Sequence, residues 1–243
     1  MTNDSIRTNI VDVLNSKHTK MRGLFMAHRE NNATKQAIVD SAIKNFLVNG
    51  FHHTSAKMIC EDVGISPGNL TFWFPTKADI LLEFTKKIMN YHTKFIEYNK
   101  SKNEENLFIY CLEIVVQIVL CEERENIRDI YYSMYSEPLT MAYLKDWTAE
   151  KNLDILGKYL PDWDLKRFRK TANVTCCIER SALAEACSED YTLEDKIRLT
   201  LTCLLKIYDF SKEDREKVID RILKTDYQKI KTEMLKQLDE FIK

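Results

Sequence analysis

Residues Thr54–Lys77 have the sequence TSAKMICEDVGISPGNLTFWFPTK, which predicts two short helices at about 55–62 and 67–73. Thr54 is the expected N-cap of the first helix, because its hydroxyl can accept a hydrogen bond from the first helical turn. Gly64 is expected to end that helix, since glycine adopts the left-handed C-terminal conformation without a steric penalty. A turn of about three or four residues then joins the two helices, which is the layout of a helix-turn-helix.

The second short helix has the residue types of a helix that contacts DNA. Ser66 is expected to cap it, and Pro67 occupies the first helical position, where a backbone N–H has no helical partner. Leu70 and Phe74 lie four residues apart and predict an inner face that packs on the core. Asn69 then lies on the outer face, where its amide can bind adenine with two hydrogen bonds in the major groove.

The segment after this helix predicts a phosphate contact. Thr76 and Asp79 form a capping pair at the start of a long helix near 77–98. The positive charge of Lys77 in the first turn is unfavourable at the positive end of the helix dipole. A phosphate bound there would interact favourably with both the lysine and the free backbone N–H groups. The residues expected to contact DNA bases or phosphates are Thr34, Lys35, Thr54, Ser55, Lys57, Ser66, Pro67, Gly68, Asn69, Thr71, Phe72, Trp73 and Lys77.

As an ordered set, the residues of this region resemble the N-terminal domain of the TetR family of bacterial transcriptional regulators. The matching positions are Phe46, Gly50, Thr54, Ser55, Ile59, Gly64, Ile65, Ser66, Gly68, Leu70, Phe74, Thr76 and Lys77. The resemblance covers about residues 32–92, and the rest of the chain matches only in being helical and of suitable length. Two positions depart from the pattern: Thr71 stands where the family usually has a phosphate-contacting tyrosine, and Cys60 replaces a small alanine.

The resemblance implies an all-α fold with three parts. Residues 1–31 form an N-terminal extension, residues 32–92 a three-helix DNA-binding head with the helix-turn-helix, and residues 93–243 a helical domain for effector binding and dimerisation. A long helix joins the head to this C-terminal domain. The resemblance further implies a transcriptional regulator, usually a repressor that responds to a small-molecule effector and binds a palindromic operator in double-stranded DNA as a homodimer. The sequence does not identify the operator, the effector, the regulated genes or the sign of regulation.

Composition agrees with a helical fold. The chain has only five glycines and four prolines, whereas an all-β chain needs many more turn residues. Apart from the helices already described, apolar periodicity predicts helices at about 34–49, 104–122, 126–135, 139–159, 164–187, 193–209 and 212–241. The last of these is expected to be amphipathic and to pack on the body or a partner subunit, with a membrane-surface helix as the less favoured alternative.

Several features predict a cytoplasmic protein without a membrane partner. The longest apolar run, Leu107–Cys121, is shorter than the ~20 residues of a membrane span and contains Glu113 and Gln117. The N-terminus lacks the apolar stretch of a secretory signal. The seven cysteines form no CxxC pair, which favours reduced thiols used as small packing residues. An oxidant sensor or soft-metal site at Cys176 and Cys177 is the less favoured alternative.

Charge is unevenly distributed along the chain. The formal net charge of the whole chain is −1, which taken alone argues against nucleic acid as a partner. Between residues 17 and 57, however, seven basic side chains are accompanied by only Glu30 and Asp40. The basic residues are Lys17, Lys20, Arg22, Arg29, Lys35, Lys44 and Lys57. This asymmetry predicts a basic contact surface on an otherwise acidic body.

The helices at 164–187 and 193–209 are the expected dimer interface, because the family resemblance implies dimerisation through two late helices. Small residues such as Ser181 and Ala182 on the first of them permit close approach of two helices. Packing within one chain is the alternative explanation for the same apolar stripes.

A small-molecule site is predicted from polar residues in apolar helices. Glu113 and Gln117 lie one turn apart in an otherwise apolar helix, and buried polar groups need partners that a ligand can supply. The favoured alternative is that Glu113 points to solvent and the aromatic side chains belong to the core; if Glu113 faces a pocket, an amine-bearing or cationic effector is expected. The candidate ligand-binding residues are Tyr110, Glu113, Gln117, Tyr131, Met134, Tyr135 and Trp147.

Catalytic and metal-binding patterns are absent from the sequence. It contains no HExxH, GxSxG, P-loop or Cys/His cluster, so we expect no enzyme activity, cofactor or metal. The alternatives to a DNA-binding regulator are a helical protein-interaction module and a small-molecule-binding protein without DNA function. The basic residues of the N-terminal extension predict an arm that enters the minor groove; alternatively, translation begins at Met21 or Met26.

Overall fold

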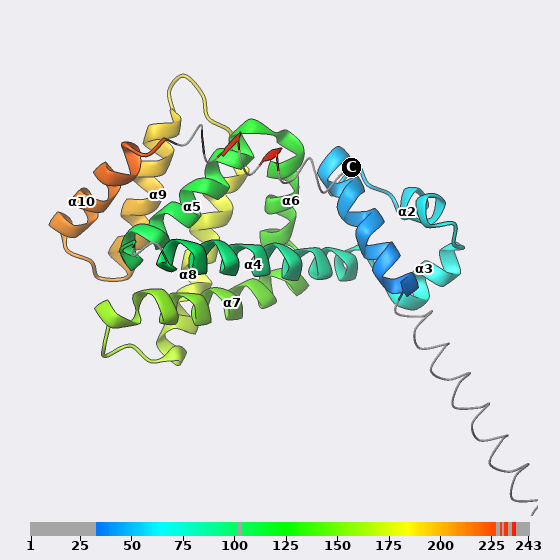
Figure 1. Ribbon diagram of the computed structural model, residues 1–243, viewed down its shortest axis with the longest axis horizontal. Coiled ribbons are helices and arrows are strands. Elements are labelled where there is room, and N and C mark those ends of the chain that lie inside the picture. The colour runs from blue at the N-terminus through cyan, green and yellow to red at the C-terminus, as the bar shows by residue number, and fades with distance from the viewer. Residues whose placement is uncertain (1–32, 102–103, 227–228, 230, 233–234, 237–243) are drawn as a thin grey trace, which may run out of the picture.

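The computed structural model describes residues 33–101, 104–226, 229, 231–232 and 235–236. Within these ranges the regular structure is helical, and one isolated β-bridge joins Ser188 to Tyr191. Figure 1 shows a small group of helices at the N-terminal end and a larger helical body, with α4 (Lys77–Ser101) running from the first into the second. The predicted all-α fold is confirmed. The predictions made for residues 1–31 lie outside the described residues.

Most helices begin and end close to their predicted positions. The first described helix comprises residues 33–49. The later helices are α2 (Ala56–Val63), α3 (Pro67–Trp73), α4 (Lys77–Ser101), α5 (Asn106–Glu123), α6 (Glu125–Ser136), α7 (Pro138–Leu156), the 3₁₀ helix η1 (Gly157–Tyr159), α8 (Leu165–Ala184), α9 (Leu193–Ile207) and α10 (Lys212–Leu223).

The single helix predicted for 212–241 is wrong, because α10 ends at Leu223. The Thr225 N–H donates to the Ile222 carbonyl at 2.9 Å, which turns the chain. The Asp226 carboxylate then accepts a hydrogen bond from the Lys229 N–H at 3.1 Å, the arrangement of an N-cap for a new helical segment. Apolar spacing continues across this junction, so periodicity alone did not predict the break.

The N-terminal group of helices surrounds a small apolar core, which we call the head. Ile38, Ala42 and Phe46 form the fully buried face of helix 33–49. The Phe46 ring packs edge to face against Phe51 and Phe84, with centroid distances of 5.4 and 5.9 Å. Phe84 lies on α4, so the helix that leaves the head also completes its core.

The remaining helices, which we call the body, pack around α5. Every residue from Leu107 to Cys121 is buried, and α5 contacts α4, α6, α7, α8, α9 and α10. This central position explains the long apolar run in the sequence, because a helix covered on all sides needs no polar face. None of the described helices is long and apolar enough to cross a membrane.

Candidate DNA-binding surface and buried polar cluster

The predicted helix-turn-helix forms as two capped helices at one end of the molecule. The Ser55 hydroxyl, not Thr54, caps α2 by accepting a hydrogen bond from the Met58 N–H at 3.2 Å. Gly64 follows α2 with a φ of 72°, and its N–H donates to the Cys60 carbonyl at 2.9 Å. This left-handed conformation strains residues other than glycine, so Gly64 ends the helix as its position predicted.

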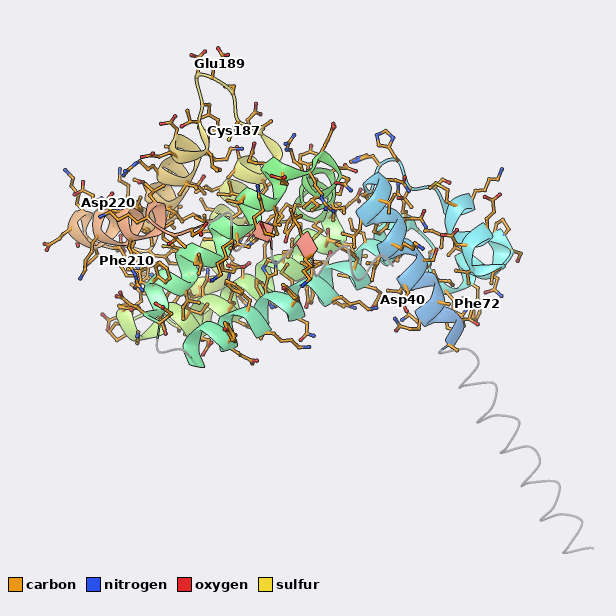
Figure 2. The ribbon with its side chains drawn as sticks, turned by 45° about the horizontal axis from the view of Figure 1, so that its top comes forward. Asp40, Phe72, Cys187, Glu189, Phe210 and Asp220 are labelled. Atoms are coloured by element: carbon orange, nitrogen blue, oxygen red, sulfur yellow. The ribbon has the colours of Figure 1, made fainter. Side chains whose placement is uncertain are left out.

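Helix α3 presents one side to the core and the other to solvent. The Ser66 hydroxyl caps it by accepting from the Asn69 N–H at 3.2 Å, and Leu70 is buried on the inner side. The outer side carries Pro67, Gly68, Asn69, Thr71 and Phe72, all exposed. Phe72 is 76% exposed and lies at the end of the head remote from the body (Figure 2). The short helix therefore has a solvent-facing edge that includes the predicted base-reading Asn69.

Two further residues of α3 modify this edge. The Thr71 hydroxyl donates to the Pro67 carbonyl at 2.9 Å, which occupies its proton and leaves its oxygen able to accept. Trp73 is half-buried against the core, and its ring contacts Phe72 edge to face at a centroid distance of 5.1 Å. Trp73 thus supports the exposed ring of Phe72 from behind.

The prediction that Thr54 contacts DNA is wrong on geometric grounds. Its side chain is 1% exposed, and its hydroxyl donates to the Gly50 carbonyl at 2.7 Å. Thr54 therefore closes the turn between helix 33–49 and α2 from inside the head, with no surface to offer a phosphate.

Lys77 has a structural role that the sequence did not predict. Its ammonium donates to the Phe51 carbonyl at 2.8 Å and the Thr54 carbonyl at 3.1 Å, and it lies 4.2 Å from the centroid of the Phe51 ring. Burial lowers the pKa of Lys77, and the nearby Asp129 and Glu137 carboxylates partly offset that effect. The lysine thus ties the start of α4 to the turn before α2, and its contact with phosphate stays a prediction.

The remaining predicted DNA contacts lie on the head with differing exposure. Lys57 is highly exposed, with an ion pair to Glu61 at 3.7 Å. Lys35 lies 4.0 Å from Glu83 and over the Phe74 ring at 5.6 Å, which holds it beside α3. Ser55 is exposed at the start of α2, and Thr34 is half-buried.

Helix α6 holds the head against the body through a defined joint. The Asn126 amide donates to the Leu47 carbonyl, and the Asp129 carboxylate accepts from the His52 N–H at 2.9 Å and pairs with the His52 ring. Gly50 has a φ of 83°, and a Cβ there would lie 2.6 Å from an Asp129 oxygen. A larger residue at position 50 would therefore be strained by the positive φ and would displace the Asp129 carboxylate from its place beside the head.

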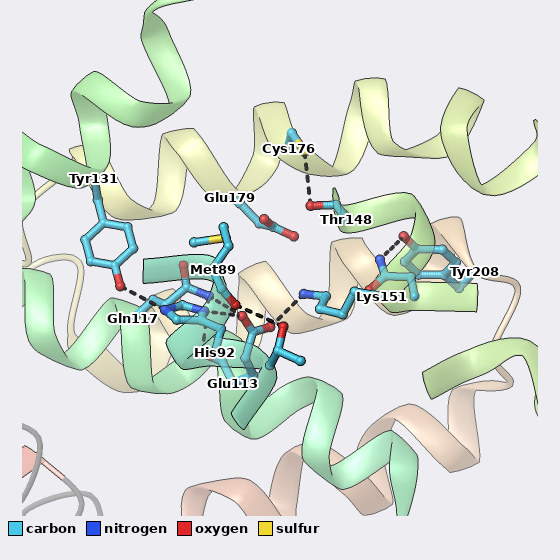
Figure 3. A network of polar contacts seen from close by, with 12 residues as sticks. Met89, His92, Glu113, Gln117, Tyr131, Thr148, Lys151, Cys176, Glu179 and Tyr208 are labelled. Carbon is cyan, nitrogen blue, oxygen red and sulfur yellow. Dashed lines mark hydrogen bonds and ion pairs between the residues drawn. The ribbon is translucent and has the colours of Figure 1, made fainter. Parts of the chain in front are cut away.

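The body contains a buried polar cluster formed by His92, Glu113, Gln117, Tyr131, Tyr135, Lys151 and Glu179, and Figure 3 labels all of these residues except Tyr135. At its centre, Glu113 is 2% exposed and binds three partners. Its Oε1 atom lies 2.7 Å from the His92 ring and accepts from the Gln117 amide at 2.8 Å, and its Oε2 atom accepts from the Lys151 ammonium at 2.8 Å. The other ring nitrogen of His92 lies 3.1 Å from the Tyr131 hydroxyl.

Electrostatics keep the Glu113–Lys151 pair ionised despite its burial. Burial opposes the charged carboxylate, but the Lys151 charge and the His92 contacts outweigh it and lower the pKa of Glu113 to about 2. Burial likewise opposes the charged ammonium, whereas the Glu113 and Glu179 carboxylates raise the pKa of Lys151. The ammonium also lies 4.8 Å from the centroid of the Trp147 ring.

Glu179 of α8 is a second buried carboxyl with fewer partners. It is 4% exposed, and its Oε2 atom accepts from the Tyr135 hydroxyl at 2.8 Å. Burial, together with the Glu113 charge, raises its pKa to about 7, although Lys151 and the Tyr135 hydrogen bond act in the opposite direction. Glu179 therefore changes its charge near neutral pH.

Glu113, Gln117, Tyr131 and Tyr135 of the predicted ligand-binding set belong to this cluster. The Lys151 ammonium lies 5.8 Å from the centroid of the buried Tyr110 ring and beside the half-buried Trp147, and Met134 is fully buried on α6. The favoured alternative, that Glu113 points to solvent, is wrong. The cation beside Glu113 is the chain's own Lys151.

His92, Lys151 and Glu179 are members of the cluster that sequence reasoning missed. Glu179 continues the buried stripe of α8 that includes Phe168 and Ala172, so its helical position indicated burial. Lys151 follows Glu150 in a charged stretch, and nothing in its neighbours distinguishes it from a surface lysine.

The free space around the cluster is small in this conformation. A cavity of about 10 Å³ lies beside His92 and Glu113, at the lower limit for one water molecule. A second space between α5 and α8 is lined by Gln117 and Glu179 and does not admit a water-sized sphere. A small molecule must therefore move side chains or helices to enter.

Comparison with known proteins connects this geometry to a family. Residues 38–84 match the sequence model of the TetR family, bacterial regulatory proteins. The HTH-type transcriptional regulator RutR of Escherichia coli strain K12 is 34% identical over 62 residues, which cover 26% of this chain and 29% of RutR. The matched segment thus spans less than a third of that relative.

Solved structures share the fold of the larger part of the chain. RolR in complex with resorcinol has a TM-score of 0.58 at 12% identity, covering 80% of this chain and 96% of RolR. Thermus thermophilus FadR, a TetR family transcriptional repressor in complex with lauroyl-CoA, has a TM-score of 0.52 at 19% identity, covering 70% of this chain and 93% of FadR. At these identities the likeness concerns the fold alone. The described part of the molecule is helical, and its head carries a helix-turn-helix that matches the TetR family of bacterial regulatory proteins over residues 38–84.

Proposed function

We propose that the chain is a ligand-responsive repressor that binds a palindromic DNA operator as a homodimer. Residues 32–92 form its DNA-binding head and residues 93–243 its effector-binding and dimerisation domain. The observation that carries the proposal is the exposed edge of α3, capped by Ser66 and carrying Asn69 near its N-terminus. A recognition helix presents such N-terminal residues to base edges in the major groove.

Within this proposal, contacts with DNA divide into base reading and phosphate binding. Asn69 pairs with adenine, and the small Gly68 permits close approach of the backbone. Lys57 is exposed on α2 and binds a phosphate; its ion pair with Glu61 is weak enough to exchange. Ser55 and Lys35 are further phosphate contacts on the same part of the head.

The homodimer is proposed to form through α8 and α9. The outer faces of these two helices expose apolar side chains, among them Val174 at 51% and Leu199 at 57%. Cys177 and Ser181 extend the exposed face of α8 with small side chains, which favour close packing of helices. A dimer of this kind must hold its two α3 helices about 34–36 Å apart to reach successive major grooves.

The effector is proposed to act through α6. This helix carries Tyr131 and Tyr135 of the buried polar cluster and, toward its other end, Asn126 and Asp129 of the joint with the head. An effector that repositions α6 then changes the position of the head. Operator and effector weaken each other's binding by the same factor, typically about 5–150-fold.

Fluorescence anisotropy tests the DNA-binding part of the proposal. It compares a duplex from upstream of the gene with a random duplex of equal length. We expect affinity for both duplexes to fall steeply with salt, and Lys57→Ala to reduce the salt slope by about 1. Lys217→Ala, an exposed lysine on α10, is the matched control and should leave the slope unchanged.

Asn69→Ala tests the recognition edge separately. It should weaken binding to the upstream duplex by roughly ten- to a hundredfold while leaving random DNA unaffected, because only the base contact is lost. Binding that is equal for both duplexes and insensitive to salt would contradict the proposed function.

A further inference from the structure

We propose that the effector is a molecule with a protonated amine beside an apolar body, and that Glu179 Oε1 and Gln117 Oε1 bind its ammonium group. This inference rests on the proposed function, because it assigns the chemistry of the proposed effector site. Three observations support the inference. Two buried acceptor oxygens have no hydrogen-bond donor, the charges around them favour a cation, and apolar residues line the same space.

Glu179 and Gln117 each bury an acceptor oxygen without a hydrogen-bond partner in the described part of the chain. The side chains are only 4% exposed. Both line the same space between α5 and α8. A buried acceptor without a donor costs about 1–3 kcal/mol, and two in one place favour a ligand that donates hydrogen bonds.

The rest of the cluster is already paired, which directs the ligand to these two oxygens. Both oxygens of Glu113 have donors, from Gln117 and Lys151 among others. Tyr135 occupies only one oxygen of Glu179. In Figure 3 the Glu179 carboxylate points into the region between α8 and Lys151 without a dashed contact to the lysine. Glu179 is therefore the carboxylate of the cluster that remains available to a donor.

The balance of charge favours a cation. Lys151 is paired with Glu113 at 2.8 Å, so an ionised Glu179 adds a negative charge that no ion pair in this cluster compensates. A ligand ammonium supplies that charge and also donates to the neutral amide oxygen of Gln117. A carboxylate ligand would place like charges together, and a buried alcohol would leave the charge of Glu179 uncompensated.

The lining of the space selects an apolar body for the ligand. Besides Gln117 and Glu179, its walls are Ile114, Ile118, Ala182 and Leu183. Since the space does not admit water in this conformation, an amine must separate α5 from α8 as it enters. That movement shifts Glu179, and with it the Tyr135 contact on α6, the helix that holds the head.

Calorimetric titration of the full chain tests the inference. The ligands are primary alkylammonium ions, from ethylammonium to hexylammonium, and benzylammonium. The matched alcohols and carboxylates with the same carbon skeletons are titrated in parallel. We expect at least one amine of the series to bind and its alcohol and carboxylate counterparts to bind at least about tenfold more weakly. Equal binding of an amine and its alcohol, or no binding by any amine of the series, overturns the inference without the need for a variant.

Glu179→Gln locates the site, because it preserves the shape of the side chain and removes its charge. It should weaken amine binding at least about tenfold. Glu150→Gln, an exposed glutamate on α7, is the matched control and should leave amine binding unchanged. Amine binding that survives Glu179→Gln places the ammonium elsewhere and contradicts the proposal.

The pH dependence of amine binding gives an independent readout. The groups that face Glu179 are Lys151 from α7, Glu113 and Tyr110 from α5, Tyr135 from α6, Cys176 from its own helix and Tyr208 at the end of α9. Among Glu179 and these six groups, Glu179 has the pKa closest to neutrality. Amine binding should therefore be tighter at about pH 8 than at about pH 6, and Glu179→Gln should remove that difference.

Failure of this inference is distinguishable from failure of the proposed function. If the chain binds upstream DNA with the expected salt dependence and no amine binds, the amine assignment is wrong and the repressor proposal stands. If an amine binds through Glu179 and the chain does not bind DNA, the chemistry of the pocket stands and the repressor proposal is wrong.

Discussion

The head and the body bury polar groups for different purposes. In the head, the buried Thr54 hydroxyl and the half-buried Lys77 ammonium bind backbone carbonyls of the turn that precedes α2. In the body, the buried carboxylates Glu113 and Glu179 lie among side chains of other helices. The head uses polar groups to complete its backbone hydrogen bonds, whereas the body collects charged side chains that the helices themselves do not require.

The different use of buried polar groups indicates that different kinds of contact stabilise the head and the body. Capping and turn contacts satisfy backbone groups of the head, and its exposed edge is set by this local chemistry. Burial of charges costs the body free energy unless they are paired, so the stability of the body depends on contacts between charged side chains of different helices. Substitutions in the head and in the body should therefore change the free energy of unfolding by different amounts and with different dependence on pH.

The largest effect is expected from breaking the buried ion pair of the body. Lys151→Met should lower the free energy of unfolding by about 3–5 kcal/mol, because it leaves Glu113 buried without its cation. Denaturant titration measures the loss. The double variant Lys151→Met with Glu113→Gln should recover part of it, and a double variant less stable than Lys151→Met alone would show that the charge of Glu113 is not the cause.

The second largest effect is a pH dependence of stability that Glu179 gives to the body. Its pKa is raised from 4.5 to about 7 in the folded chain, so the stability it contributes is present below about pH 4.5 and is lost as the pH rises through 7. Since one pKa unit corresponds to about 1.4 kcal/mol, the loss is on the order of 3 kcal/mol.

Glu179→Gln should therefore be more stable relative to the wild type at about pH 8 than at about pH 5, as measured by urea unfolding at both values. Glu113 does not confound this window, because its lowered pKa of about 2 places its own loss of stability below about pH 4.5. An unchanged pH dependence in the variant would mean that Glu179 is not the group that titrates.

A third effect tests the joint between the two regions. Gly50→Ala should destabilise the chain by about 1–3 kcal/mol, because the residue has a positive φ and the new Cβ meets Asp129 at 2.6 Å. Gly68→Ala is the control: its nearest atom lies at 4.0 Å and it is helical, so stability should stay equal or rise. Thermal unfolding followed by circular dichroism measures both variants. Equal destabilisation by both would argue against a specific contact at the joint.

The smallest effect is expected in the head itself. Ser66→Ala removes the cap of α3 and should cost about 1 kcal/mol, with Ser55→Ala costing a similar amount at the start of α2. Hydrogen exchange of the Asn69 and Met58 amides measures these local losses. Ser66→Ala should speed exchange of the Asn69 amide alone, and Ser55→Ala should speed exchange of the Met58 amide alone.

Local chemistry explains why the head was predictable from the sequence. Ser66, Pro67 and Gly64 act within a few residues of the positions they specify, so their order along the chain was sufficient to predict α2, the turn and α3. The error at Thr54 is instructive, because Thr54 and Ser55 are both capping residues. The choice between them depended on the carbonyl of Gly50, which folding brings next to Thr54.

The sequence by itself determined the helical class and the helix-turn-helix, because each depends on residues that are neighbours along the chain. Only the tertiary structure decided the joint at Asp129 and the buried polar cluster. His92, Glu113, Lys151 and Glu179 come from four different helices, and no spacing rule relates residues on separate helices. Their partners, charges and pKa values exist only after those helices pack, which is why the chemistry of the body could not be predicted from the order of its residues.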